Sequence, residues 1–308
     1  MKKLVFYSLI SFMFIAVILI LLIKPKNNSI NILSVENNYM RIITENELLS
    51  IVLFYDDVDN FLLEKTNISR VSLSDEFNEI ELTIDSIDVS AVPVTYQNNH
   101  YYEATYNFNF DWNNLEGLNL NFSSAKLNIN YINEVKYNFQ IGDVNLSFLS
   151  LQSPAYLDIN RMYGVVNEID DSKTLLAVAL KLDNLTNSPI TIKNIYSNNP
   201  KLGFNLENTK ITKEIYLAET NIQEVIPNYY LIENPNEIDI HLNEENFYII
   251  PLIYLEGYTK ITRLPIYIDY LYQNTIHTYI IDDFLFFNEG LNLDANQDKI
   301  TEYIYNYS

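Results

Sequence analysis

A run of twenty apolar positions near the N-terminus, from Leu4 to Ile23, most constrains what this chain can fold into. Its only polar members are Tyr7, Ser8 and Ser11, and fifteen of its residues are Leu, Ile, Val or Phe. A helix of this length spans about 30 Å, which is the thickness of the hydrocarbon layer of a bilayer. The run therefore predicts a transmembrane helix, with residues 4–23 in the lipid bilayer.

The competing interpretation of the same segment is a cleaved signal peptide. Such a peptide has a shorter apolar region and ends in a small-x-small cleavage site. Here Ala16 is the only alanine of the segment, and Lys24-Pro25-Lys26 follows it, so an uncleaved anchor is favoured.

The orientation of the segment in the membrane is only weakly indicated by charge, because lysines lie on both sides of it. Because long downstream domains translocate largely regardless of charge, we expect the N-terminus in the cytoplasm and the bulk of the chain outside it, in a single-pass protein of the cell membrane.

Beyond about residue 30, apolar and polar residues alternate in short runs. Tyr102, Ala104, Tyr106, Phe108 and Phe110 occupy every second position, which in a strand places them on one face. The chain holds 25 tyrosines and 16 phenylalanines but only 6 glycines and 9 prolines, and aromatic residues pack well on half-buried sheets. We therefore expect an all-β fold after the anchor.

Two halves of this region resemble each other in the same order. Leu127-x-Ile129-x-Tyr131 has a counterpart in Ile266-x-Ile268-x-Tyr270, and in each case nine residues separate the tyrosine from a following Ile-x-Asp. Residues 48–53 likewise resemble residues 175–180. A spacing near 130 to 140 residues suits tandem domains of ordinary size. The predicted organisation is an anchor (1–29), two antiparallel β-sandwiches (30–152 and 153–290) and a C-terminal tail (291–308) that forms a short helix or stays loose; chance similarity of alternating strands is the alternative.

The second half offers a resemblance to a known class of domain. Residues 174–194, TLLAVALKLDNLTNSPITIKN, consist of an alternating run, an Asn-rich turn with Pro189, and another alternating run. This segment resembles the opening of many immunoglobulin-like extracellular modules, although the Cys-Trp-Cys core of antibody-type domains is missing. The resemblance implies immunoglobulin-like sandwiches and carries no activity.

Charge and cysteine content exclude several functions. The net charge is −21, so the surface repels phosphate backbones, and we expect no nucleic-acid partner. There is no cysteine, which excludes disulfides, thiolate metal sites and a lipidated cysteine. With so few glycines, a phosphate-binding loop is also disfavoured, and we expect no cofactor.

The candidate site residues are few. Trp112, Tyr101 and Tyr229 could present aromatic rings to a ligand, although packing within the sheets is the alternative for each. Asp294, Asn296 and Asp298 have the spacing that begins a calcium loop, but Lys299 occupies the position that needs glycine. The three histidines are far apart in sequence, and no metal site is expected from them. We expect no catalytic residues.

These features predict a non-enzymatic binding or accessory module of a bacterial cell envelope that engages another envelope protein through its sheets. One alternative is a module that binds cell-wall polysaccharide through exposed Trp and Tyr. Another is a hydrolase that uses loop carboxylates, since a pair of them about 5 to 9 Å apart suffices for glycoside hydrolysis. The carboxylates concerned are Asp56, Asp57, Asp59, Asp75, Glu76, Asp170, Asp171, Asp282 and Asp283.

Overall fold

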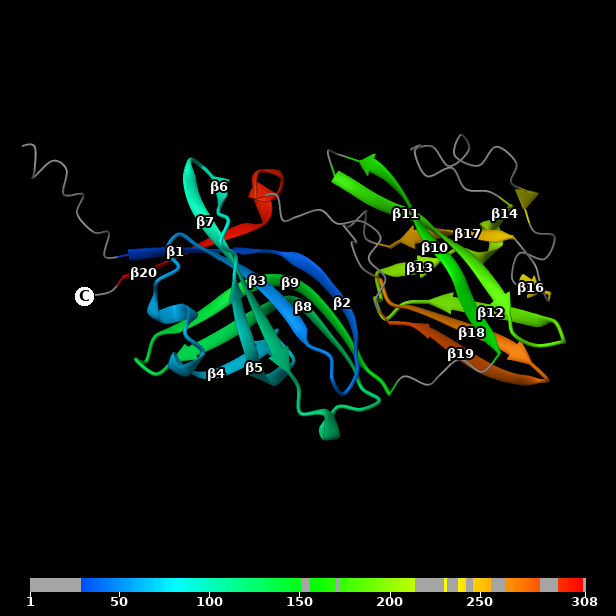
Figure 1. Cartoon of the computed structure of the whole chain (residues 1–308), viewed down its shortest axis with the longest axis horizontal. Coiled ribbons are helices and arrows are strands. Elements are labelled where there is room, and N and C mark those ends of the chain that lie inside the picture. Colours follow the sequence, from blue (N-terminus) through cyan, green and yellow to red (C-terminus); the bar gives the residue numbers. More distant parts are fainter. Residues whose placement is uncertain are drawn as a thin grey trace, which may run out of the picture.

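The computed structural model describes residues 29–150, 156–169, 172–213, 230–231, 238–241, 246–255, 264–282 and 293–306. The predicted transmembrane segment lies outside these ranges. Within them, no helix has the length and apolar character needed to cross a bilayer. The regular structure of the described chain is β-strand apart from five short 3-10 helices, as the alternation predicts (Figure 1). These helices are η1 (Phe61–Leu63), η2 (Lys65–Asn67), η3 (Trp112–Asn114), η4 (Leu206–Asn208) and η5 (Asp294–Lys299).

The first sandwich is built from the strands that precede residue 150. In sheet order, β2 and β9 are followed by β8, β4, β5, β7, β3 and β1, and β6 pairs with β7. All neighbours are antiparallel except β2 and β9, which are parallel. The strands are β1 (Ser29–Val35), β2 (Asn37–Ile43), β3 (Leu49–Tyr55), β4 (Ile68–Ser74), β5 (Glu79–Val89), β6 (Val94–Tyr96), β7 (Asn99–Asn109), β8 (Asn119–Tyr131) and β9 (Lys136–Phe148).

This order is that of an immunoglobulin-like sandwich. Strands β1, β3, β7 and β5 correspond to the A-B-E-D sheet of a constant-type domain, and β4, β8 and β9 to its C-F-G sheet. Strand β5 joins the two sheets, because it pairs with β4 up to Leu82 and with β7 from Thr83 onward, with a bulge between Ile84 and Ser86 in the second part. Inward residues of both sheets, including Tyr106, Phe108 and Phe139, form one continuous core.

The second sandwich repeats this plan. One sheet has the order β10-β11-β17-β14-β15, with β13 paired to β17, and the other has the order β16-β12-β18-β19. In immunoglobulin terms these are an A-B-E-D sheet and a C-F-G sheet. The strands are β10 (Leu157–Ile169), β11 (Ser172–Asn184), β12 (Ile190–Tyr196), β13 (Leu202–Phe204), β14 (Lys210–Thr212), β15 (Tyr230–Leu231), β16 (Ile238–Ile240), β17 (Phe247–Tyr254), β18 (Ile266–Tyr272) and β19 (Thr275–Ile281).

The repeated sequence segments occupy equivalent strands. Residues 48–53 and 175–180 fall in or beside the B strands β3 and β11, while Leu127 to Tyr131 and Ile266 to Tyr270 lie in the F strands with the same residues buried. The sequence repeat does not extend to the pairing of the next strand. Ile281 pairs with Ile266, whereas Phe139 pairs with Leu127, because β18 runs two residues further before its turn. Equal sequence spacing therefore does not give equal register in the two G strands.

The C-terminal residues differ from the expected short helix or loose tail. Ile300–Asn306 form strand β20, which pairs antiparallel with β1 along its whole length. The final strand of the chain thus returns to the first sandwich, and the second sandwich lies between β9 and β20 in sequence (Figure 1). The alternation Ile300, Glu302, Ile304 against Thr301, Tyr303, Tyr305 is a strand pattern, but a seven-residue run gives no indication of its distant partner.

The two sandwiches touch through the loop between β12 and β13. Lys201 Nζ lies 3.3 Å from Asp143 Oδ2, and Asn198 Nδ2 donates hydrogen bonds to the Asn145 carbonyl and the Ser147 hydroxyl. Met40, from β2, is buried and packs with the core of the second sandwich. Polar contacts and one apolar side chain thus join the two units.

Candidate functional site

The outer edge of β19 is the most distinctive surface of the second sandwich. The β18–β19 hairpin turns through Gln273 and Asn274, whose φ angles are 47° and 61°, the geometry of a two-residue type I′ turn. In such a hairpin the residues that flank the turn, Tyr272 and Thr275, form a hydrogen-bonded pair, and hydrogen-bonded pairs then alternate along the ladder. The N–H and C=O groups of Ile276, Thr278 and Ile280 therefore point away from β18.

No described strand pairs with this side of β19. Its sequence, TIHTYII, contains no charged residue, proline or glycine. Exposed edges of soluble proteins are usually protected by charge, proline or a bulge, because unpaired backbone groups recruit another strand. Ile276 is 65% exposed beside this edge. The edge therefore combines free backbone groups, strand-forming side chains and no protective feature.

Acidic side chains lie next to the edge. Thr278 Oγ1 donates to Asp269 Oδ1 at 2.7 Å, and Tyr279 Oη donates to Asp158 Oδ1 at 3.2 Å. Burial and the Asp158 carboxylate raise the pKa of Tyr279 to about 12, so its hydroxyl remains a donor. An incoming strand with lysine or arginine near its ends would meet complementary charge here.

The equivalent edge of the first sandwich is closed by a parallel strand. Strand β2 pairs with β9 from Gly142 to Phe148. Gly142 has a φ of +92°, and a Cβ at this position would lie 2.2 Å from the Asn37 carbonyl oxygen. Only glycine permits both this backbone conformation and the close approach of β2.

Tyrosines of β20 close the rest of that edge. The Gln140 N–H, which lies beyond the reach of β2, donates to Tyr303 Oη at 2.8 Å, and Tyr137 Oη donates to the Ile304 carbonyl at 3.2 Å. The Tyr303 ring packs edge-on against Phe139 at 4.9 Å between centroids. Tyrosine side chains of β20 thus give the outer edge of β9 hydrogen-bond partners and packing, for which the described structure shows no counterpart at β19.

The aromatic residues proposed from the sequence are not an exposed platform in the described structure. Tyr101 is 4% exposed and packs in a small cluster with Tyr96 and Phe54. Trp112 is half-buried against the first core, 6.2 Å from the Phe148 ring. Tyr229 lies outside the described residues. Alternation identifies a strand and its buried face, but it does not predict which aromatic side chains in the loops are exposed to solvent.

The proposed calcium ligands lie in and around η5. Asn296 is buried and Asp298 is exposed, and within the described residues no group of acidic or histidine side chains has the geometry of a metal site. Asp294 begins the 3-10 helix, which takes the place of the open loop that a calcium site needs. The helix leads directly into β20, so its role here is to start that strand.

Several of the candidate carboxylates hold turns. Asp56 accepts hydrogen bonds from the backbone and side chain of Asn31, and Asp57 accepts the N–H of Asp59. Asp75 accepts three backbone N–H groups, from Phe77, Asn78 and Ser123. Asp170, Asp171 and Asp283 lie outside the described residues. The hydrolase alternative therefore stays a prediction without a described pair to support it.

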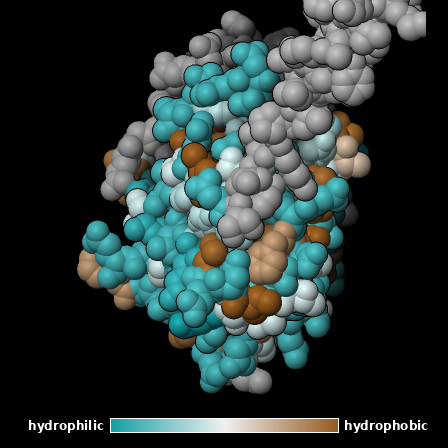
Figure 2. Space-filling view, turned by 90° about the vertical axis from the view of Figure 1, so that its left-hand side faces the viewer, coloured by the Kyte–Doolittle hydropathy of each residue, from teal (hydrophilic) through white to brown (hydrophobic). Residues whose placement is uncertain are grey.

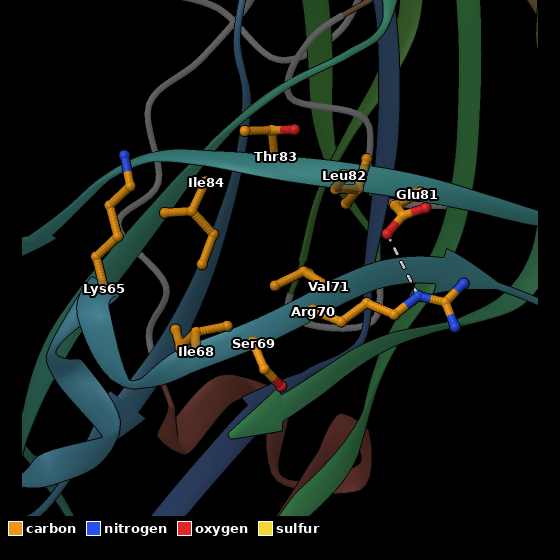
Figure 3. Close-up of a pocket in the computed structure, with 9 residues that line it drawn as sticks. All are labelled: Lys65, Ile68, Ser69, Arg70, Val71, Glu81, Leu82, Thr83 and Ile84. Carbon is orange, nitrogen blue, oxygen red and sulfur yellow. Dashed lines mark ion pairs between the residues drawn. The ribbon is translucent and has the colours of Figure 1, made fainter. Parts of the chain in front are cut away.

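A cavity of about 320 Å³ opens where β4 and β5 separate. The β4–β5 pairing ends at Val71 and Leu82, beyond which β5 pairs with β7 instead. Figure 3 shows Ile68 and Ile84 in the space between the two strands, with Arg70 turned toward Glu81. Arg70 Nε lies 3.4 Å from Glu81 Oε1. The cavity is a crease over core side chains, and most of its polar side chains already have partners. Arg70 pairs with Glu81, Lys65 donates to the Asp85 carbonyl, and Ser69 donates to the Asn130 carbonyl.

Figure 2 shows the end of the molecule on the left-hand side of Figure 1. Outside the parts drawn in grey, hydrophobic residues appear there as separate spots among hydrophilic ones. The part of that face drawn in colour therefore lacks the broad apolar area expected of a large docking surface.

No family model matches this chain, and no curated protein matches it. Among solved structures it is similar to the C-terminal domain of the Streptococcus agalactiae AgI/II polypeptide BspA, at 10% identity over 81% of this chain and 99% of that one, with a TM-score of 0.20. A titin fragment, A168169, matches at 7% identity over 82% of this chain and 97% of that one, with a TM-score of 0.17. These superpositions are loose, so the fold assignment rests on the strand order described above.

Proposed function

We propose that this chain is a non-enzymatic module tethered to the outer face of a bacterial cell membrane, in which the open edge of β19 takes up an extended strand of another envelope protein. The observation that carries the proposal is the unpaired, uncharged edge of β19 beside Asp158 and Asp269. Strand addition gains affinity from backbone hydrogen bonds and specificity from alternate side chains.

The path of the chain supports presentation of this edge away from the membrane. Strand β1 begins at Ser29, shortly after the apolar segment that ends at Ile23, and β20 pairs with β1. Both ends of the described chain therefore belong to the first sandwich. The second sandwich lies at the far end of the long axis (Figure 1), where a tethered module would expose it to partners.

The charge of the chain restricts the partner. A net charge of −21 disfavours anionic polymers and anionic lipid surfaces. A strand that docks on β19 would add apolar side chains at alternate positions, one of them against Ile276, and basic residues near its ends would face Asp158 and Asp269. The partner class is an extended, basic segment of an envelope protein.

Cysteine labelling tests on which side of the membrane the first sandwich lies. Because the chain has no cysteine, a Val92→Cys variant offers a single thiol at a side chain that is 73% exposed. A maleimide that does not cross membranes should label it in intact cells. Labelling that appears only after lysis would place the first sandwich in the cytoplasm.

Site-specific photocrosslinking tests the docking edge. A photoreactive amino acid at position 276 should form an adduct with one envelope protein, and mass spectrometry should place the crosslinked peptide in an extended segment with flanking lysine or arginine. The matched control is Ile132, which is 61% exposed at the turn between β8 and β9. Equal adducts at positions 132 and 276, or an adduct that persists after Thr278→Pro disrupts the edge, would refute docking at β19.

A further inference from the structure

A polar groove on the first sandwich forms a second surface, separate from β19. It encloses about 700 Å³, within the range of about 300 to 1,000 Å³ that small-molecule sites occupy. Its floor is the outer face of the C-F-G sheet, where cross-strand rows place Ser74 beside Lys126 and Gln140, and Asn128 beside Asn138. The floor is therefore made of amides, a hydroxyl and one ammonium group.

The walls of the groove are held by hydrogen bonds. Asp75 Oδ1 accepts the N–H groups of Phe77 and Asn78 at 2.8 and 2.7 Å, and its Oδ2 accepts the Ser123 N–H at 3.1 Å. One carboxylate thus ties the β4–β5 turn to the bulge in β8. Desolvation opposes ionisation, but these backbone bonds outweigh it and lower the pKa of Asp75, so the carboxylate stays charged and keeps the wall in place.

An aromatic ring stands at the rim of the groove. Phe77 lines it and is 89% exposed, although its backbone is fixed by the Asp75 turn. The ring is therefore presented to solvent from an ordered position. On the opposite wall, Ser124 has a φ of 50° and donates its N–H to Asp143 Oδ1 at 3.0 Å, which keeps the β8 bulge raised above the sheet.

Two amides on the floor are available to a ligand. Asn128 donates to the hydroxyls of Ser72 and Ser74 at 3.2 and 2.9 Å, which fixes its orientation. In the described part of the chain, the side chains of Asn138 and Gln140 make no such bond, and each offers two donors and one acceptor oxygen. Amides of this kind match neighbouring hydroxyls, which both donate and accept.

We propose that this groove binds a neutral saccharide chain, with ring hydroxyls on Asn138 and Gln140 and an apolar sugar face against Phe77. The chemistry of the floor favours a polyhydroxylated ligand over an apolar peptide, which would leave the amides unpaired. An anionic glycan is disfavoured, because Lys126 is the only cation in a groove that also contains Asp75 and Glu76. The proposal is independent of docking at β19.

Saccharide binding by the full chain in detergent or nanodiscs tests the inference. The probes are arrayed oligomers of neutral hexoses and N-acetylhexosamines, with sulfated and carboxylated oligomers for comparison, and calorimetry then gives the Kd of the best ligand. We expect binding to neutral oligomers and a rise in Kd of about two- to tenfold in Phe77→Ala, since an aromatic contact contributes about 0.5 to 1.5 kcal/mol. Asn138→Ala should weaken binding severalfold, and Phe77→Tyr should retain it.

Control variants separate binding from folding and from the other surface. Val92→Ala removes an apolar side chain that is 73% exposed outside the groove, and Ile276→Lys changes the β19 edge; neither should alter the Kd. Because Phe77 is exposed, its alanine variant should keep the wild-type Tm. Absence of binding to every neutral oligomer, binding to anionic oligomers alone, or an unchanged Kd in both Phe77→Ala and Asn138→Ala would overturn the inference.

Discussion

The G strands of the two sandwiches, β9 and β19, occupy the same place in one topology, but the outer edge of β9 is closed and that of β19 is open. Strand β9 is bordered by the parallel strand β2 from Gly142 to Phe148, and Tyr303 Oη accepts the N–H of Gln140, which lies outside that range. Strand β19 has no described strand on its outer side. The same fold thus has a closed G-strand edge in the first sandwich and an open G-strand edge in the second.

The difference arises from a few residues. Gly142 lets β2 approach β9, and β20 returns across the length of the chain to complete the seal. In the second sandwich, Ile281 lies beside Ile266 in the register where Phe139 lies beside Leu127. The edge of a G strand is therefore closed only where further strands, here β2 and β20, are added to the sandwich. Without them the edge can pair with another chain.

Removal of β20 should produce the largest effect, and only on the first sandwich. Truncation after Asn292 removes the ladder with β1 and exposes Phe139, on which Tyr303 packs. We expect the free energy of unfolding of the first sandwich to fall by about 4 to 6 kcal/mol, from lost packing and an unpaired Gln140 N–H. Hydrogen exchange resolved by domain measures it. An equal loss in both sandwiches would show that β20 does not belong to the first alone.

Gly142→Ala should make the first sandwich resemble the second at its G edge. The added methyl would collide with the Asn37 carbonyl, and the φ of +92° would be strained, so β2 should leave β9. We expect a loss of about 2 to 4 kcal/mol and a greater tendency to aggregate. Denaturant unfolding and light scattering report both. The matched control is Gly203→Ala, where the added Cβ meets Ile253 only at 3.8 Å and should be tolerated.

Alkaline pH should unfold the first sandwich before the second, because more tyrosines of strongly raised pKa lie in the first: among the described residues only Tyr279 of the second sandwich has a pKa raised to about 12. Burial raises the pKa of Tyr106 from 10.0 to about 12, and burial beside Tyr106 raises the pKa of Tyr55 well above 10.0. Unfolded tyrosine releases its proton near pH 10, so stability is complete below that value and falls as the pH rises toward 12. Tyr106 alone should contribute a loss of about 2 to 3 kcal/mol.

A pH titration followed by domain-resolved NMR checks this order. The hydroxyls of Tyr55 and Tyr106 lie 2.7 Å apart in the first core, so Tyr106→Phe should lower stability at neutral pH but reduce its decline above pH 10. Simultaneous loss of both sandwiches in the wild-type protein would contradict the expected order.

Ile276→Lys should have the smallest effect on stability. The side chain is 65% exposed, and a lysine on an edge strand costs little, so we expect a change within about 0.5 kcal/mol. The same charge should abolish docking of a partner strand, because edge lysines block pairing. A large loss of stability would indicate that Ile276 packs within the sandwich and does not border an open edge.

Local patterns predicted the strands better than they predicted the surfaces. Alternation identified β7, and residues 48–53 and 175–180 indicated the two B strands, because period-two patterning reports which face of a strand is buried. The pairing of β20 with β1 could not be predicted, since pairing over more than 260 positions leaves no mark in a seven-residue run. For Tyr101 the alternative of packing holds, because Tyr96 and Phe54 cover the face of β7 that carries its ring.

The open edge and the groove had weak signals. The uncharged run of β19 could have identified an unprotected edge, had its place at the border of the sheet been known. Phe77, within the turn Asp75-Glu76-Phe77-Asn78, is an aromatic residue in a segment otherwise suited to solvent. Neither signal identifies a binding surface until the order of the strands in the sheets is known.

Amide hydrogen exchange in the full chain without a partner tests the central comparison most directly. The amides of Ile276, Thr278 and Ile280 should exchange rapidly although their neighbours in β19 are protected. The amides of Gln140, which donates to Tyr303, and Leu149, which donates to the Ile43 carbonyl, should exchange slowly. Slow exchange at all three β19 positions would contradict the account, because it would mean that the second sandwich is closed as the first is.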